Sequence, residues 1–142
     1  MPPASSFVGP SGFRILVAED NPVNQKVFEI ILRRDGFAVD VVSDGKQAVE
    51  AHRSKRYDLI LMDLQMPELD GLEATRQIRR LPEKQPMIIA VTADIIAGVR
   101  ERCLQAGMDD YVSKPVTRQQ LLDLVKSAYE QIAARDTIRR AS

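Results

Sequence analysis

Short apolar runs in this sequence lead into side chains that can do chemistry. These side chains are Glu19, Asp20, Asp63, Thr92 and Lys114. Three carboxylates that lie close together repel one another, so either one takes up a proton or a cation lies between them. Oxygen ligands favour a hard cation such as Mg²⁺, which keeps several waters and binds one or two carboxylates together with phosphate oxygens. If the fold brings these side chains together, they predict a site for Mg²⁺ and a phosphoryl group.

Asp63 is the expected nucleophile of this site, because a carboxylate can form an aspartyl phosphate. A phosphoryl group on Asp63 would meet Mg²⁺, the Thr92 hydroxyl and the Lys114 charge around its oxygens, as phosphoryl transfer requires. Each residue also has an ordinary structural interpretation, as a turn former, a helix cap or a solvated charge. The chemical interpretation is favoured because these residues follow four separate strands, Glu19 and Asp20 after the same one, at a single edge of the predicted sheet.

The apolar runs themselves have the length and composition of buried strands. They are rich in Val and Ile, and stretches with helical spacing separate them. The predicted strands are 15–18, 38–42, 59–62, 87–91 and 111–112. The first, third and fourth are apolar at consecutive positions, as in a parallel sheet that helices cover on both faces. The alternation predicts an α/β fold with a doubly wound, five-stranded parallel sheet and five helices, which binds ligands at the carboxyl ends of its strands.

The predicted helices carry start and stop signals. The first opens near Pro22 and ends before Gly36, and its apolar side chains share one face, as they do where a helix packs on a core. That face comprises Val23, Val27, Ile30 and Ile31. Capping residues precede the later helices. They are Asp44 with Gln47, Asp70, Asp94, and Thr117 with Gln120.

Length and composition predict one domain with two polar ends. The chain has 142 residues, of which 44% are hydrophobic, enough for one continuous core. Residues 1–13, rich in Pro, Ser and Gly, are expected to form a flexible tail or linker, 14–132 the domain, and 133–142 a polar, fraying tail.

Charge, cysteine content and hydropathy exclude several classes of protein. Lys plus Arg and Asp plus Glu both number 20, so no overall positive charge favours nucleic acid binding. Cys103 is the single cysteine, and no apolar run reaches the roughly 18 residues of a membrane span. The composition predicts a reducing, cytoplasmic location without membrane contact.

Four segments, taken together, resemble the receiver domains of two-component response regulators. The segments are ILVAEDNPVNQ at 15–25, DLILMDLQMPELDG at 58–71, VTA at 91–93 and DYVSKP at 110–115. The resemblance spans roughly residues 14–132. The sequences of the four segments are most similar to those of receivers of hybrid sensor histidine kinases. It implies a flavodoxin-like, CheY-like fold with strand order 2-1-3-4-5.

The family resemblance also implies roles for individual residues. Asp63 would accept a phosphoryl group from a phosphohistidine on a partner protein. Mg²⁺, with Mn²⁺ as an alternative, would be held by Asp20, Asp63 and the backbone carbonyl of Gln65. Glu19 would act mainly through a metal-bound water, and it replaces the aspartate that is more frequent in the family. Lys114 would precede a cis peptide bond to Pro115.

The resemblance also implies a conformational switch and residues that control the lifetime of the phosphoryl group. Thr92 would turn toward the phosphoryl group and Tyr111 would swing inward, remodelling the face formed by the fourth helix, fifth strand and fifth helix. Gln65 and Asp94 would tune the rate at which water removes the phosphoryl group. The protein would be a signalling phosphoacceptor that catalyses only its own phosphorylation and dephosphorylation. Its partners would be a sensor histidine kinase or a histidine phosphotransfer protein, or a second copy bound through the switch face.

Three other functions compete with the phosphoacceptor interpretation. A Mg²⁺-dependent phosphohydrolase usually places its nucleophile and acid on one strand end, whereas the acidic pair and Asp63 follow different strands here. A pseudo-receiver, kept only for protein contacts, would lack one of the key residues, and none is missing. A nucleotide-binding module would carry a glycine-rich phosphate loop after the first strand, and neither common pattern occurs there. His52 and Cys103 are interpreted as packing residues rather than as parts of a site.

Overall fold

The computed structural model describes residues 12–82, 84–93 and 97–141. They form one parallel sheet of five strands in the order β2-β1-β3-β4-β5, which confirms the predicted fold class and strand order. The strands are β1 (Arg14–Ala18), β2 (Ala38–Val42), β3 (Leu59–Met62), β4 (Met87–Thr92) and β5 (Asp110–Ser113). The helices are α1 (Pro22–Arg34), α2 (Gly45–Lys55), α3 (Gly71–Arg79), α4 (Val99–Ala106) and α5 (Arg118–Ala141).

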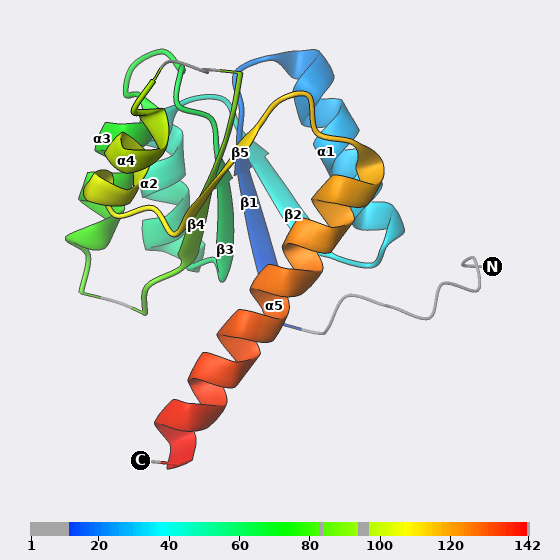
Figure 1. The fold of residues 1–142 in the computed structure, drawn as a ribbon, viewed down its shortest axis with the longest axis vertical. Coiled ribbons are helices and arrows are strands. Elements are labelled where there is room, and N and C mark those ends of the chain that lie inside the picture. The colour runs from blue at the N-terminus through cyan, green and yellow to red at the C-terminus, as the bar shows by residue number, and fades with distance from the viewer. Residues whose placement is uncertain (1–11, 83, 94–96, 142) are drawn as a thin grey trace.

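Helices cover both faces of the sheet, with α1 and α5 on one side and α2, α3 and α4 on the other (Figure 1). The pleat of the central strands turns alternate residues toward the two layers. Ile60 and Met62 of β3 face one core cluster, whereas Leu59 and Leu61 face the other. All four residues of β3 are therefore buried, which explains the uninterrupted apolar run in the sequence.

The predicted caps of three helices are confirmed. Asp44 Oδ1 accepts a hydrogen bond from Gln47 N at 2.7 Å, and Asp70 Oδ1 accepts one from Glu73 N at 2.9 Å. At α5, Thr117 and Gln120 form the reciprocal pair of a capping box, with donor–acceptor distances of 3.0 and 2.9 Å. At α2 the reciprocal bond differs from the box, because Gln47 Oε1 accepts from Ser43 N instead of Asp44 N.

Most of the apolar face predicted for α1 does not pack on the core; of its four residues, Ile31 alone is partly buried against the core cluster that contains Phe28. Phe28 and Leu32 are the buried residues of this helix. Val23, Val27 and Ile30 are 70%, 45% and 49% exposed. Helical periodicity identifies residues that share a face, but α1 carries apolar residues on more than one face, and the sheet buries only the face that contains Phe28.

The ends of α4 and α5 also differ from expectation. α4 begins at Val99, after Gly98 in a left-handed conformation with φ of 85°, and Asp94 lies outside the described residues. α5 does not end at Ile132 but continues to Ala141, so the described part of the predicted tail, 133–141, is helical. This segment contains Ala and Arg but no Gly or Pro, which favours helix. The predicted tail at 1–13 lies almost entirely outside the described residues.

Candidate functional site at the carboxyl edge of the sheet

Backbone hydrogen bonds align the carboxyl ends of neighbouring strands. Asp63 N donates to Ala18 O at 3.0 Å, and Glu19 N donates to Val42 O at 3.0 Å. Lys114 N donates to Thr92 O at 2.8 Å. These bonds extend the parallel ladders by one residue beyond the strands, so the side chains that follow β1, β3 and β5 emerge at the same edge, as predicted.

Three carboxylates meet at this edge. Oxygens of Glu19, Asp20 and Asp63 all lie within 4.8 Å of one another. Glu19 is 2% exposed and Asp63 is 7% exposed, whereas Asp20 is exposed to solvent. A cluster of this kind offers only oxygen ligands and concentrates negative charge, so its chemistry fits a hard divalent cation that keeps part of its water shell.

Lys114 neutralises part of this charge. Its Nζ donates to Asp63 Oδ2 at 3.0 Å and also pairs with Glu19 Oε1. Burial alone would lower the pKa of Lys114, but its hydrogen bonds and charge interactions with Glu19 and Asp63 outweigh burial, so the pKa is raised. The lysine is therefore cationic at neutral pH. The Lys114–Pro115 peptide bond is cis, as the family resemblance implied.

Glu19 has a second contact that sequence patterns did not predict. Its Oε2 accepts a hydrogen bond from the backbone N of Asn21 at 3.0 Å, so both carboxylate oxygens of Glu19 have protein partners. Asn21 in turn caps α1 by accepting from the backbone N–H groups of Val23 and Asn24. An asparagine directly before Pro22 is a recognisable N-cap pattern. The contact with Glu19, however, depends on the path of the loop.

Thr92 and Tyr111 lie on the β4–β5 side of the site. Thr92 is the last residue of β4 and is 1% exposed. Tyr111 pairs in register with Ala90 and packs, half-buried, against the core cluster on the α2–α3–α4 side. The chain thus places both residues on the strands next to α4, while Asp94 lies outside the described residues.

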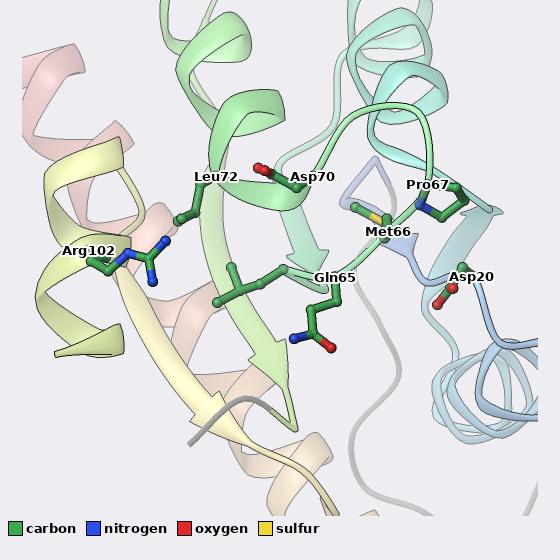
Figure 2. A pocket seen from close by; sticks show the side chains of 8 residues that line it. Asp20, Gln65, Met66, Pro67, Asp70, Leu72 and Arg102 are labelled. Carbon is green, nitrogen blue, oxygen red and sulfur yellow. The ribbon is translucent and has the colours of Figure 1, made fainter. Parts of the chain in front are cut away.

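The β3–α3 loop forms the other wall of the site. Gln65 N donates to Asp63 Oδ1 at 3.2 Å, and the Gln65 side chain is exposed. An open cavity of about 600 Å³ lies along this loop, between Asp20 and Arg102 of α4 (Figure 2). Sequence patterns did not single out Arg102, because its place at this cavity depends on how α4 packs against α3.

Gly71 allows α3 to approach the site closely. A Cβ atom at this position would lie 2.1 Å from the backbone oxygen of Asp63. Gly71 N also donates to Leu64 O at 3.0 Å. The first residue of α3 is therefore packed directly against the strand end that carries Asp63.

Together, fold and site define a doubly wound α/β domain with an acidic, lysine-bearing site at the carboxyl edge of its sheet. The family described as "Response regulator receiver domain" matches residues 15–126. The chain therefore belongs to the response regulator receiver domain family, which confirms the resemblance carried by its motifs.

Curated relatives are large histidine kinases. Hybrid signal transduction histidine kinase I of Dictyostelium discoideum is 44% identical over 122 residues, which is 80% of this chain and 7% of the relative. Signal transduction histidine-protein kinase BarA of Escherichia coli is 41% identical over 112 residues, covering 78% of this chain and 12% of the relative. The chain thus corresponds to a small part of each.

Solved structures give the same family. The receiver domain of sensor histidine kinase PA1611 from Pseudomonas aeruginosa, with a magnesium ion coordinated in its active-site cleft, is 48% identical with a TM-score of 0.75, covering 87% of this chain and 99% of that one. The receiver domain of Saccharomyces cerevisiae Ssk1, in complex with the histidine phosphotransfer protein Ypd1, is 31% identical with a TM-score of 0.74, covering 89% and 90%.

Among residues 12–82, 84–93 and 97–141, no helix has both the length and the apolar character needed to span a bilayer.

Proposed function

We propose that this chain is a phosphoacceptor that receives a phosphoryl group on Asp63 in a Mg²⁺-dependent reaction. The observation that carries the proposal is the meeting of Asp63, two further carboxylates and a half-buried lysine at one point of the sheet edge. The magnesium ion in the PA1611 receiver supports the same chemistry here. Asp20, Asp63 and the Gln65 carbonyl would hold the ion, and Glu19 would contact it through water.

The proposed reaction exchanges one bond to phosphorus for another. An Asp63 oxygen attacks the phosphorus of a phosphohistidine, and the bond between phosphorus and the donor imidazole nitrogen breaks. The electron pair of that bond stays on the imidazole, which takes up a proton as it leaves. When bound, Mg²⁺ would offset the negative charge shared by the carboxylates and the phosphoryl oxygens. Lys114 and the Thr92 hydroxyl would bind phosphoryl oxygens.

The donor would be a histidine kinase or a histidine phosphotransfer protein. Relatives of this chain are kinases of this kind, and the Ssk1 receiver is known in complex with a phosphotransfer protein. The apolar side chains exposed on α1 support a docking face beside the site. Val27 also lines a cavity of about 330 Å³ that reaches Lys114 and Pro115.

Phosphorylation would switch the face formed by α4, β5 and α5. Thr92 would move toward the phosphoryl group and Tyr111 would turn inward, so that the phosphoryl group stabilises one of two existing states. A second copy or an output partner would read that face. Thr92→Ala should still be phosphorylated, yet nuclear magnetic resonance signals of Tyr111 should no longer shift on activation. A normal shift in that variant would rule out the coupling.

Water would remove the phosphoryl group from Asp63 again. Gln65 and Asp94 would set how quickly water removes the phosphoryl group, and the chain would catalyse no reaction on a separate small substrate. A cytoplasmic location is expected, since the one cysteine, Cys103, cannot form a disulfide within the chain.

Intact mass after incubation with acetyl phosphate and Mg²⁺ tests the phosphoacceptor proposal. One phosphoryl adduct should appear on the wild-type chain, and it should be lost with a chelator or in Asp63→Asn. Asp123→Asn, an exposed aspartate on α5, serves as the matched control and should still form the adduct. Because rapid hydrolysis can hide the adduct, binding of beryllofluoride is measured in parallel.

The competing functions predict different results in the same experiment. Absence of both the adduct and the beryllofluoride complex would favour a pseudo-receiver. Sustained release of phosphate from many small phosphate esters, without dependence on acyl phosphates, would favour a phosphohydrolase.

A further inference from the structure

Gln25 of α1 contacts the backbone of Glu19, one of the three clustered acidic residues. Its side-chain Nε2 donates to the backbone oxygen of Glu19 at 2.5 Å and to Ser43 Oγ at 3.2 Å. The residue is half-buried. The reaction outlined above uses neither Gln25 nor Ser43.

The orientation of the Gln25 amide follows from its partners. A backbone carbonyl can only accept a hydrogen bond, so the group that faces Glu19 must be the NH₂ end of the amide. A side chain of the same length without a donor would leave this carbonyl without that bond. The role of Gln25 is therefore chemical and does not depend on volume alone.

The bond acts on the peptide unit that joins two acidic residues. The carbonyl of Glu19 belongs to the same planar unit as the N–H of Asp20. On the other side, Glu19 N is tied to Val42 O at 3.0 Å. The N–H and the carbonyl of Glu19 are both hydrogen-bonded. The orientation of the peptide unit between Glu19 and Asp20 is therefore fixed. Asp20 is exposed, and the position of its Cα limits the region that its carboxylate can reach.

Ser43 connects the same amide to the start of α2. Ser43 N donates to Gln47 Oε1 at 2.9 Å. Gln25 thus joins the β1–α1 loop to the β2–α2 loop, and both loops flank the acidic cluster.

We propose that Gln25 is a positioning residue of the cation site, which holds the Glu19–Asp20 peptide so that the three carboxylates are arranged for Mg²⁺ before the ion binds. The inference rests on the proposed function and deepens it. Partners that orient ligands without touching the metal commonly change metal affinity by about 10-fold to 100-fold when removed.

Calorimetric titration of the full chain with Mg²⁺ tests this role. Gln25→Met keeps the length and helix preference of the side chain but removes the donor. The Kd for Mg²⁺ should rise about tenfold, while the thermal midpoint without metal stays close to that of the wild type. Phosphorylation by acetyl phosphate should slow at limiting Mg²⁺ and recover at saturating Mg²⁺, because the reactive groups themselves are intact.

Gln47→Met is the matched control. It breaks the bond to Ser43 N in the same network but leaves the Glu19 carbonyl bonded. Its Kd for Mg²⁺ should remain near the wild-type value. An equal rise in both variants would show general loosening of the loops and would overturn the inference, as would an unchanged Kd in Gln25→Met.

Failure of the inference and failure of the proposed function give different results. If the wild-type chain binds no Mg²⁺, the proposed function fails, and the role of Gln25 fails with it. If the wild-type chain binds Mg²⁺ and forms the Asp63 adduct while Gln25→Met binds equally well, only the role of Gln25 is rejected.

Discussion

Lys114 pairs with Glu19 and Asp63 of the proposed cation site, so the lysine and a bound cation would neutralise the same carboxylates. The Lys114 ammonium lies between Glu19 and Asp63, and its side chain is only 16% exposed. Removing the lysine would take away the positive charge that Glu19 and Asp63 share. A bound cation would then supply all of the compensation instead of part of it.

Lys114→Met should therefore make stability more dependent on Mg²⁺. Without metal, the free energy of unfolding should fall by about 2 kcal/mol, the size expected for a hydrogen bond between charged groups. Saturating Mg²⁺ should stabilise the variant more than the wild type, as measured by urea unfolding with and without the ion. Equal stabilisation of the two proteins would contradict this coupling.

The difference in the free energy of unfolding between wild type and Lys114→Met should depend on pH in a defined direction. Because the pKa of Lys114 is raised in the folded protein, its contribution to stability is complete below the pKa of lysine in an unfolded chain, about 10.4. The contribution is lost as the pH rises through the higher folded-state pKa. The difference between wild type and Lys114→Met should therefore hold at neutral pH and shrink in strongly alkaline solution.

At the scale of single elements, α1 has two apolar surfaces with different roles. One surface, with Phe28 and Leu32, packs on the sheet. The other, with Val23, Val27 and Ile30, remains exposed beside the site. Two arginines occupy the last turn of the helix, so an acidic rim on the partner would complement this end of the face.

Ile30→Glu, at an exposed residue of this face that does not line the cavity beside Lys114, should separate docking from chemistry. A charge placed in the apolar contact should slow transfer from a purified histidine phosphotransfer protein by about tenfold or more. Phosphorylation by acetyl phosphate, which needs no protein contact, should proceed at the wild-type rate. Ile138→Glu, at an exposed apolar residue on α5, is the control and should leave both rates unchanged. Equal slowing with both donors would show damage to the site instead of to docking.

At the scale of the whole molecule, the site and the far end of α5 lie at opposite ends of the sheet (Figure 1). The carboxyl edge gathers the site from loops that follow separate strands. α5 runs from this end along the sheet and continues past it (Figure 1). Near its far end, Lys84 Nζ pairs with Asp136 Oδ2 at 3.2 Å, linking the extension to the turn before β4. The body of the domain thus still contacts α5 at Asp136.

Local sequence patterns determined much of this protein. Uninterrupted apolar runs predicted β1, β3 and β4 because strands buried on both faces must be apolar at every position. Capping residues predicted the starts of α2, α3 and α5, because side-chain caps act within three residues. The acidic residues, Asp63, Thr92 and Lys114 were predicted to meet because all parallel strands present their carboxyl ends at one edge.

Tertiary structure alone decided which groups touch and which faces are exposed. The pair of Lys114 with Glu19 joins residues 95 positions apart, and the bond from Gln25 to the Glu19 carbonyl depends on how α1 leaves the sheet. Periodicity grouped Val23, Val27 and Ile30 but could not tell that the sheet covers another face of α1. Such contacts depend on packing between elements, whereas caps and strand patterns depend on neighbours in sequence.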